Sequence, residues 1–184
     1  SFWAKPVWVP QVRSTMFAVR TPVWNGDTFI GMLVAGVTVD QLSRFIARSG
    51  DAPLAANRFI LFDHDYVLAH RNMADGGYVR NDDVPLPGLA QVRDPVLAQL
   101  WSVDNRRRMP IALSPHTGGH VTSIGGRNHI FLYRELEDFG IPLTVGIYAG
   151  PDDGLGRELR RLVWAGVAGI GMILVCVIGA ILVG

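Results

Sequence analysis

The sequence predicts an α+β protein in which antiparallel strands and short helices are followed by one transmembrane helix. Three observations lead to this fold class. Runs rich in β-branched and apolar residues recur between residues 12 and 148 and are separated by turn-forming Gly, Asn, Asp and Pro. Two shorter segments have helix-start residues, Asp40 and Asp94, ahead of apolar residues at helical spacing. A long uncharged run stands at the C-terminal end.

The uncharged run extends over residues 162–183, which is 22 residues. As a helix it would be roughly 33 Å long, enough to cross the hydrocarbon core of a bilayer. A buried core helix is the alternative, but such helices are seldom apolar on every face over this length. The chain is 49% hydrophobic with a mean hydropathy of +0.24, and this excess is concentrated in the run. We therefore expect the lipid bilayer to be one partner of the chain.

A predicted hairpin comes first in the chain. Its strands are residues 12–24 and 28–38, with Asn25 and Gly26 between them. Both residue types tolerate the positive φ that the central positions of a tight hairpin turn require. The sequence begins with Ser1 rather than Met, directly among apolar and aromatic residues. We therefore expect it to be a piece of a longer chain.

An amphipathic helix is predicted to follow the hairpin. Asp40 provides its start, and Leu42, Phe45 and Ile46 share one face. Residues 49–53 are rich in Ser, Gly, Asp and Pro, and they predict a linker. We place a boundary between two modules there.

The second unit begins with two short strands, residues 59–62 and 67–70, joined by Asp63-His64-Asp65. A loop-rich stretch leads to Asp94-Pro95, where a helix through Leu100 and Trp101 is expected. Three further strands, at residues 120–124, 128–136 and 142–148, predict an antiparallel meander. A last helix is expected to start near residue 152 and to continue into the membrane span.

Charge and cysteine content exclude several functions. The formal net charge is +1, and the one dense basic run, Arg106–Arg108, predicts a solvated loop rather than a nucleic-acid surface. The single cysteine, Cys176, lies within the predicted span, so no disulfide framework exists. His116 and His120 have the spacing of metal ligands on a helix, but the Pro and Gly around them disfavour that helix. We therefore predict no metal and no cofactor.

Five residues are candidates for a small-molecule site. His70 ends a strand beside the Gly-rich loop, where it either faces a ligand or ties the loop to the sheet as a hydrogen-bonded structural residue. Tyr78, Trp101, Tyr133 and Arg134 are of the types that line concave ligand pockets, although core packing explains them equally well. Tyr133 and Arg134 are neighbours on one strand and must face opposite sides of the sheet.

Three segments resemble the double Cache sensor, a PAS-like extracytoplasmic domain of bacterial transmembrane receptors. TPVWNGDTFIGMLVAGVTVDQLSRFI resembles the last strands and exit helix of the membrane-distal module. FILFDHDYVLAHR resembles the opening hairpin of the membrane-proximal module, and HIFLYRELEDFGIPLTVGIYAG resembles its final two strands. The resemblance implies that residues 1–48 are the C-terminal part of the distal module, residues 54–150 the proximal module, and residues 151–184 the juxtamembrane and transmembrane helix.

The resemblance also implies a function. Residues 1–161 would lie outside the cytoplasm, bind a small molecule and pass a signal through the last helix of a homodimer to a cytoplasmic domain. The segments DPVLAQLW and GGRNHIFLYREL, with the ending RELRRLVWAG, also look like sensors of bacterial adenylate/guanylate cyclases. A histidine kinase or a chemoreceptor is the alternative output. Arg157, Arg160 and Arg161 oppose this topology, because basic residues favour the cytoplasmic side.

One position departs from the amino-acid-binding members of this family. Those members carry an Asp in the last distal strand, and it pairs with the ammonium group of the ligand. Gly36 stands at that position in this sequence and cannot supply a charge. We therefore expect that the distal module does not hold an α-amino acid in this way.

An enzyme held in the membrane by a C-terminal tail is the alternative of another class. The sequence contains no nucleophile elbow, phosphate-binding loop, dinucleotide-binding glycine pattern or zinc-protease motif. We therefore predict no catalytic residues within these 184 residues.

Overall fold

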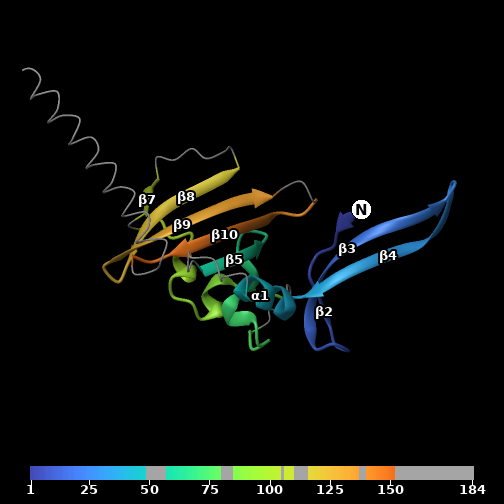
Figure 1. The fold of residues 1–184 in the computed structure, drawn as a ribbon, viewed down its shortest axis with the longest axis horizontal. Helices are drawn as coiled ribbons and strands as arrows, with labels where there is room; N and C mark the ends of the chain where they lie inside the picture. Colours follow the sequence, from blue (N-terminus) through green and yellow to red (C-terminus); the bar gives the residue numbers. More distant parts are fainter. Residues whose placement is uncertain (49–56, 80–84, 105, 110–115, 137–139, 152–184) are drawn as a thin grey trace, which may run out of the picture.

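The computed structural model describes residues 1–48, 57–79, 85–104, 106–109, 116–136 and 140–151. They form two antiparallel sheets with one α-helix, α1 (Val39–Arg48), beside both (Figure 1). This architecture agrees with the predicted α+β class. The predicted linker and the predicted juxtamembrane and transmembrane helix lie outside the described residues. Within the described part of the chain, no helix is long and apolar enough to cross a membrane.

The N-terminal sheet is a long hairpin with two short strands beside it. β3 pairs with β4 along its whole length, and with β1 and β2 along its other edge. The hairpin extends away from the rest of the molecule as an arm (Figure 1). The strands of this sheet are β1 (Phe2–Trp3), β2 (Val7–Val9), β3 (Ser14–Asn25) and β4 (Thr28–Thr38).

The second sheet has six antiparallel strands in the order β6-β5-β10-β9-β8-β7. β8, β9 and β10 form the predicted meander, and β5 with β6 forms the predicted hairpin. The connection between β6 and β7 includes three short 3₁₀ segments. These elements are β5 (Asn57–Phe62), β6 (Tyr66–His70), η1 (Arg71–Met73), η2 (Leu89–Val92), η3 (Leu97–Gln99), β7 (Arg106–Arg108), β8 (Thr117–Ile124), β9 (Arg127–Leu136) and β10 (Leu143–Ala149).

The turn of the arm is shifted by one residue from its predicted position. Asn25 is paired with Thr28, so Gly26 and Asp27 are the central residues of the turn. Gly26 has a φ of 57°, and Asp27 is not among the residues with positive φ. Positive φ at the first central residue alone is the pattern of a type II′ turn, in which glycine is preferred there.

The start of α1 also differs from the prediction. The Gln41 N–H donates to Thr38 Oγ1 at 3.3 Å, and the Thr38 N–H donates to Gln41 Oε1 at 3.3 Å. This reciprocal pair is a capping box, so Thr38 rather than Asp40 caps the helix. Phe45, predicted on the buried face, is 67% exposed, whereas Val39 and Ser43 are buried. The helix therefore packs through a face rotated from the predicted one.

Two other predictions are corrected by the structure. Asp94 does cap the segment after it, but that segment is only the 3₁₀ turn η3 and not an α-helix. The Arg106–Arg108 run is a strand, β7, rather than a solvated loop. β7 is the edge strand of its sheet, where one side of the backbone and the charged heads of Arg107 and Arg108 reach water. Charge on a short edge strand is common, and this explains why charge patterning alone pointed to a loop.

The core lies on one face of the six-stranded sheet. Phe59, Phe131 and Tyr148 point to this face from three adjacent strands and are at most 1% exposed. The 3₁₀ segments and α1 pack over them and complete the hydrophobic cluster. The core depends on close approach at Gly146 in β10, because an added Cβ there would lie 2.3 Å from the Phe59 ring. Gly146 is therefore a packing requirement rather than a turn residue.

We predict that Gly146→Ala lowers the free energy of unfolding by about 1–3 kcal/mol, because the new methyl group overlaps a fully buried ring and the Leu132 carbonyl. Urea unfolding followed by tryptophan fluorescence measures this change. The matched control is Gly31→Ala in β4, where an added Cβ meets nothing within 4 Å. Equal stability of the two variants would show that β10 and β5 are not packed as described.

Candidate functional site

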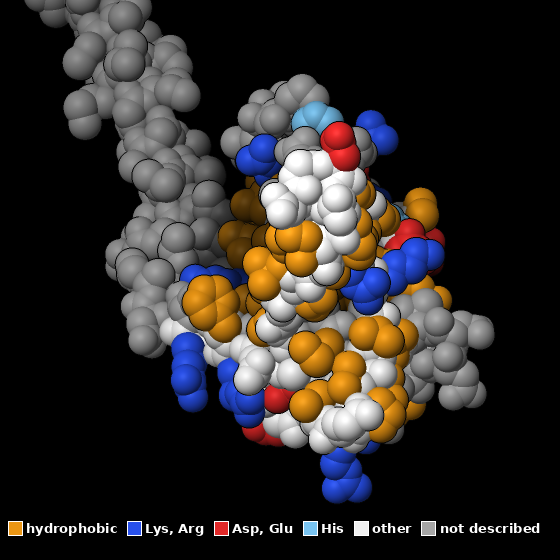
Figure 2. Space-filling model, turned by 90° about the vertical axis from the view of Figure 1, so that its right-hand side faces the viewer, with side chains coloured by type: hydrophobic (Ala, Val, Ile, Leu, Met, Phe, Trp, Pro, Cys, Tyr) orange, Lys and Arg blue, Asp and Glu red, His pale blue; other side chains and the backbone are white. Residues whose placement is uncertain are grey.

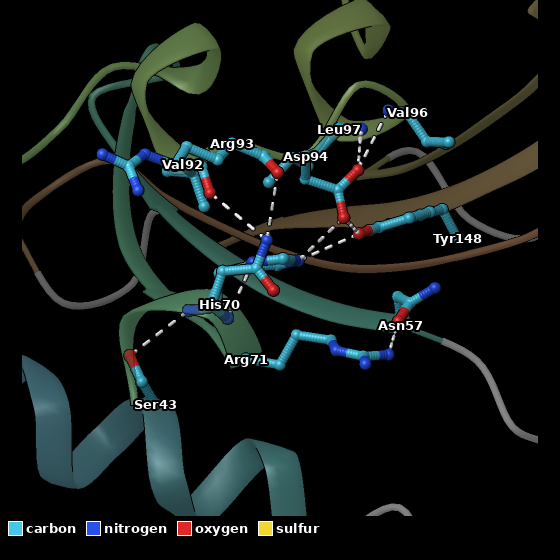
Figure 3. A network of polar contacts seen from close by, with 11 residues as sticks. Ser43, Asn57, His70, Arg71, Val92, Arg93, Asp94, Val96, Leu97 and Tyr148 are labelled. Atoms are coloured by element: carbon cyan, nitrogen blue, oxygen red, sulfur yellow. Dashed lines mark hydrogen bonds and ion pairs between the residues drawn. The ribbon is translucent and has the colours of Figure 1, made fainter. Parts of the chain in front are cut away.

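His70 lies at the centre of a buried polar network that connects four parts of the fold (Figure 3). It is the last residue of β6 and is 0% exposed. Its Nε2 is 2.9 Å from the Tyr148 hydroxyl in β10, and its Nδ1 accepts from the Asn72 N–H at 3.3 Å. The His70 backbone N–H donates to Ser43 Oγ in α1 at 3.3 Å. This histidine therefore links the loop after β6 to the sheet and to the helix.

The hydrogen bonds of the network define the roles of their atoms. The Tyr148 hydroxyl donates to Asp94 Oδ2 at 2.6 Å, so its oxygen is left to accept from His70 Nε2. His70 must then carry its proton on Nε2, and Nδ1 is free to accept from Asn72. Every member has a partner that matches its role. The geometry consequently favours a neutral His70.

Asp94 joins the network to the segment above the sheet. Its Oδ1 accepts from the backbone N–H groups of Val96 and Leu97, each at 2.9 Å. Its other oxygen receives the Tyr148 hydroxyl. A single carboxylate therefore holds the start of η3 against the last strand. A displacement of β10 would be transmitted to η3 through these bonds.

The pKa of His70 is lowered to about 4, chiefly by burial, which outweighs the raising effect of the Asp94 charge, and the Arg71 charge contributes to the lowering. A neutral histidine at physiological pH agrees with the donor and acceptor roles in the network.

A row of rings extends from this network across the core face. The Tyr148 ring lies 5.6 Å from the Phe131 ring, which in turn lies 5.0 Å from the His120 ring, with both pairs stacked. These rings belong to β10, β9 and β8, which are adjacent strands. His70 and His120 therefore mark the two ends of one continuous aromatic row.

Trp101 and Tyr133, two of the predicted site residues, contact each other at the β7–β8 end of this face. Their ring centroids are 5.1 Å apart in an edge-on arrangement. Trp101 stacks on His64 at 4.0 Å and donates from Nε1 to the His64 carbonyl at 2.9 Å. The Tyr133 hydroxyl accepts from Arg106 at 3.1 Å. The structure thus brings these two aromatic residues together, whereas Tyr78 lies in a separate pocket.

Tyr78 lines a pocket of about 620 Å³ at the junction of the two sheets. The pocket is lined by side chains of both signs and by aromatic rings, among them Trp8, Arg13, Asp40, Asp75 and Tyr78. Its volume is within the range of small-ligand sites. Burial raises the pKa of Asp40, but hydrogen bonds, chiefly from Ser14, and the Arg44 charge more than offset this, so the pKa lies below its ordinary value. Asp40 is therefore an anion at the wall of the pocket.

Two other sequence-based candidates lie apart from these groups. Arg134 is exposed on the face opposite Tyr133, as the alternation of the strand requires. His116 is exposed and His120 is buried in β8, so the two do not form a pair on a helix. Within the described residues, no group of three or more potential metal ligands occurs.

Sequence reasoning missed Tyr148 and Asp40 as site residues and treated Asp94 only as a helix cap. Tyr148 occupies an inward-facing position of a predicted strand, so alternation indicates burial but not a hydrogen-bonding partner. The pairing of Tyr148 with Asp94 spans 54 residues of sequence, and no local pattern records it. Asp40 was predicted only as a cap, since the pocket forms from three distant segments.

No protein-family model matches this sequence, and no curated protein matches it. Its fold is found in ligand-binding domains of bacterial chemoreceptors. The domain of Pseudomonas fluorescens CtaA in complex with L-isoleucine matches 85% of this chain and 54% of its own, with a TM-score of 0.50 and 10% identity. This likeness shows a Cache-like sensor fold.

Two further solved domains are similar to a lesser degree. Pseudomonas aeruginosa PAO1 PctB with L-Arg has a TM-score of 0.47 and 14% identity over 83% of this chain and 55% of its own. PctC of the same organism with GABA has a TM-score of 0.46 and 13% identity, over 80% of this chain and 54% of its own. The chain thus spans about half the length of the solved domains that it matches.

We predict that Tyr148→Phe destabilises the fold by about 1–3 kcal/mol, because His70 Nε2 and Asp94 Oδ2 both lose their hydrogen bond to the Tyr148 hydroxyl. Urea unfolding gives the change in free energy. The control is Val145→Ala in the same strand, at a side chain that is 40% exposed. A Tyr148→Phe variant as stable as the wild type would contradict the network.

A second prediction concerns pH. His70 and His120 have folded-state pKa values of about 4, below the ordinary value of 6.5. Between these values the unfolded chain binds more protons than the folded chain, so stability is constant above pH 6.5 and decreases as the pH falls toward 4. Urea unfolding at pH 7, 6 and 5 tests this, and His70→Gln should reduce the slope. An unchanged stability from pH 7 to pH 5 would show that neither histidine is held neutral.

Proposed function

We propose that this chain is the sensory part of a membrane receptor that binds a small molecule outside the cytoplasm and transmits the binding event through its C-terminal helix. The observation that carries the proposal is the fold, which is that of chemoreceptor ligand-binding domains. The junction pocket provides a place for a ligand. The uncharged run at residues 162–183 provides a membrane anchor.

The proposed module division is residues 1–48, residues 54–150 and residues 151–184. The arm supports the first boundary, because its strands expose apolar side chains that a complete sheet would cover (Figure 2). We infer that these strands are the last part of a second module, whose other elements pack on them. The exposed apolar residues of the arm are Val23, Trp24, Phe29, Ile30, Met32, Leu33 and Val34.

The ligand is proposed to bind in the junction pocket, in contact with Tyr78. Arg13 and Asp75 add charges of opposite sign, and Trp8 adds a second aromatic wall. This site lies between the first module, at the base of its sheet and the start of α1, and the loop at residues 75–78 of the second module, where a ligand would couple the two modules. His70 is proposed to relay the resulting movement rather than to contact the ligand, because all of its polar atoms are already engaged.

An α-amino acid held by the distal strands remains disfavoured under this proposal. Gly36 has no side chain, and an added Cβ would lie 2.9 Å from Met16 and 3.3 Å from Ala18. A carboxylate at this position would require Met16 to move. The amino-acid ligands of the solved relatives belong to domains only 10–14% identical to this chain, so they are not transferred.

Signal transfer is proposed to follow β10. This strand ends at Ala149, directly before the proposed juxtamembrane helix, and Tyr148 ties it to Asp94 and His70. A ligand-induced shift of α1 would reach β10 through Ser43 and His70. We propose a parallel homodimer in which the last helices pass on this displacement.

The output domain is proposed to be that of a chemoreceptor, with a cyclase or a histidine kinase as alternatives.

The test is ligand screening of the full 184-residue chain in lipid nanodiscs, by thermal shift with sugars, amines, amino acids and organic acids. We expect at least one class to raise the melting temperature, and Tyr78→Ala and Asp75→Asn to weaken its binding by about tenfold or more. The control is Asp27→Asn at the tip of the arm, which removes the same charge far from the pocket. If no class stabilises the chain, or if all three variants bind equally, the pocket is not the sensor site.

A further inference from the structure

His120 is a buried histidine that lacks the hydrogen bonds such a residue normally makes. Its side chain is 0% exposed, and among the described residues neither Nδ1 nor Nε2 makes a well-formed hydrogen bond, although the Leu100 backbone is close enough to favour the protonated ring. His70, at the other end of the same aromatic row, has both ring nitrogens bonded. Buried polar groups in native proteins are nearly always paired, so two open nitrogens on one ring need an explanation.

Two neighbours of His120 share this property. Thr122 is two residues farther along β8 on the same face, is 2% exposed, and its Oγ1 is unpaired. Arg106 is paired with Thr122 across β7 and β8, and its Nε is buried and unpaired. The four unpaired polar atoms therefore belong to three residues that neighbour one another on β7 and β8. These two strands form the edge of the sheet that lies away from the arm (Figure 1).

The charge at this position is also unbalanced. Arg106 donates to the neutral Tyr133 hydroxyl, and in the part of the chain that the structure describes it has no carboxylate within ion-pair distance. Burial of the ring, together with the Arg106 charge, lowers the pKa of His120 to about 4, and the Leu100 backbone offsets part of this effect. Arg106 is partly buried, with its Nε shielded from water. A partly buried cation without a counter-ion loses solvation, and an anion beside it offsets that loss.

We propose that Arg106, His120 and Thr122 bind a small carboxylate anion on the core face of the six-stranded sheet. Arg106 Nε–H and the Thr122 hydroxyl donate to its two oxygens, and the N–H of His120 is a third donor. Arg106 carries the only formal charge among these three side chains at neutral pH, so a monoanion balances it. The rings of Phe131 and Tyr133, 5.0 Å and 5.9 Å from His120, exclude a bulky ligand.

This site is separate from the junction pocket. None of its three residues lines that pocket, and its occupation does not require the chain to be a receptor. Its ligand would instead stabilise the sheet to which β10 belongs.

The experiment titrates the full chain in nanodiscs with sodium formate, acetate and propionate, against sodium chloride at equal ionic strength. We expect at least one carboxylate to raise the melting temperature in a saturable manner, and calorimetry to give one site per chain. Arg106→Gln should weaken binding by about tenfold or more. The matched control is Arg107→Gln, which removes the same charge from the opposite face of β7 and should leave binding unchanged.

Thr122→Val gives a second readout that does not depend on the arginine. In buffer without carboxylates, this variant should unfold at a higher temperature than the wild type, because it removes an unpaired buried hydroxyl. With carboxylate present, it should gain less stability than the wild type. A lower melting temperature of Thr122→Val without carboxylate, an equal effect of the two arginine variants, or stabilisation by chloride alone would each overturn the proposal.

Discussion

Much of the fold's arrangement depends on the pair of hydrogen bonds made by the Tyr148 hydroxyl. It donates to Asp94 and accepts from His70, so one oxygen holds the last strand, the segment above the sheet and the loop after β6. Its ring packs between Phe59 and Phe131 on the core face. A buried hydroxyl is tolerated only when both of its roles are satisfied, and here both partners come from distant parts of the chain. The position of β10 is consequently coupled to that of α1.

Small residues in the central strands make this arrangement possible. Gly146 leaves space for the Phe59 ring, and Gly118 leaves space for the Tyr133 ring, which would be 2.4 Å from an added Cβ. Both glycines lie in strands rather than turns, where glycine ordinarily weakens the strand. Their cost is offset because each lets an aromatic ring lie flat across a neighbouring strand. The result is a continuous layer of rings from His70 to His120.

The two ends of that layer differ in a way that bears on sensing. At the His70 end every polar atom is engaged, and the network joins α1 to β10. At the His120 end, four polar atoms of the described residues have no hydrogen-bond partner, and no described carboxylate pairs with Arg106. A satisfied network resists distortion, whereas unpaired polar atoms would gain from a ligand. The proposed anion would therefore act at the less satisfied end of the layer.

The sequence by itself determined the local elements. Alternation and turn residues predicted the arm, the β5–β6 hairpin and the meander of β8 to β10, because hairpins are specified by residues that are close in the chain. It also placed Tyr133 and Arg134 on opposite faces. Two predictions failed because a local pattern fitted two structures. Thr38 and Asp40 are both good helix caps, and Thr38 is the one used. The charges of β7 are typical of a loop but are also tolerated on an edge strand.

Only the tertiary structure decided which side chains meet. The pairing of Tyr148 with Asp94 and the grouping of Arg106 with Thr122 and His120 join residues that are far apart in sequence. Such contacts follow from strand order and register, which the β6-β5-β10-β9-β8-β7 sheet defines and which no local pattern encodes. The physical reason is that periodicity reports which face a residue occupies, whereas a site also requires knowing which strand lies beside it.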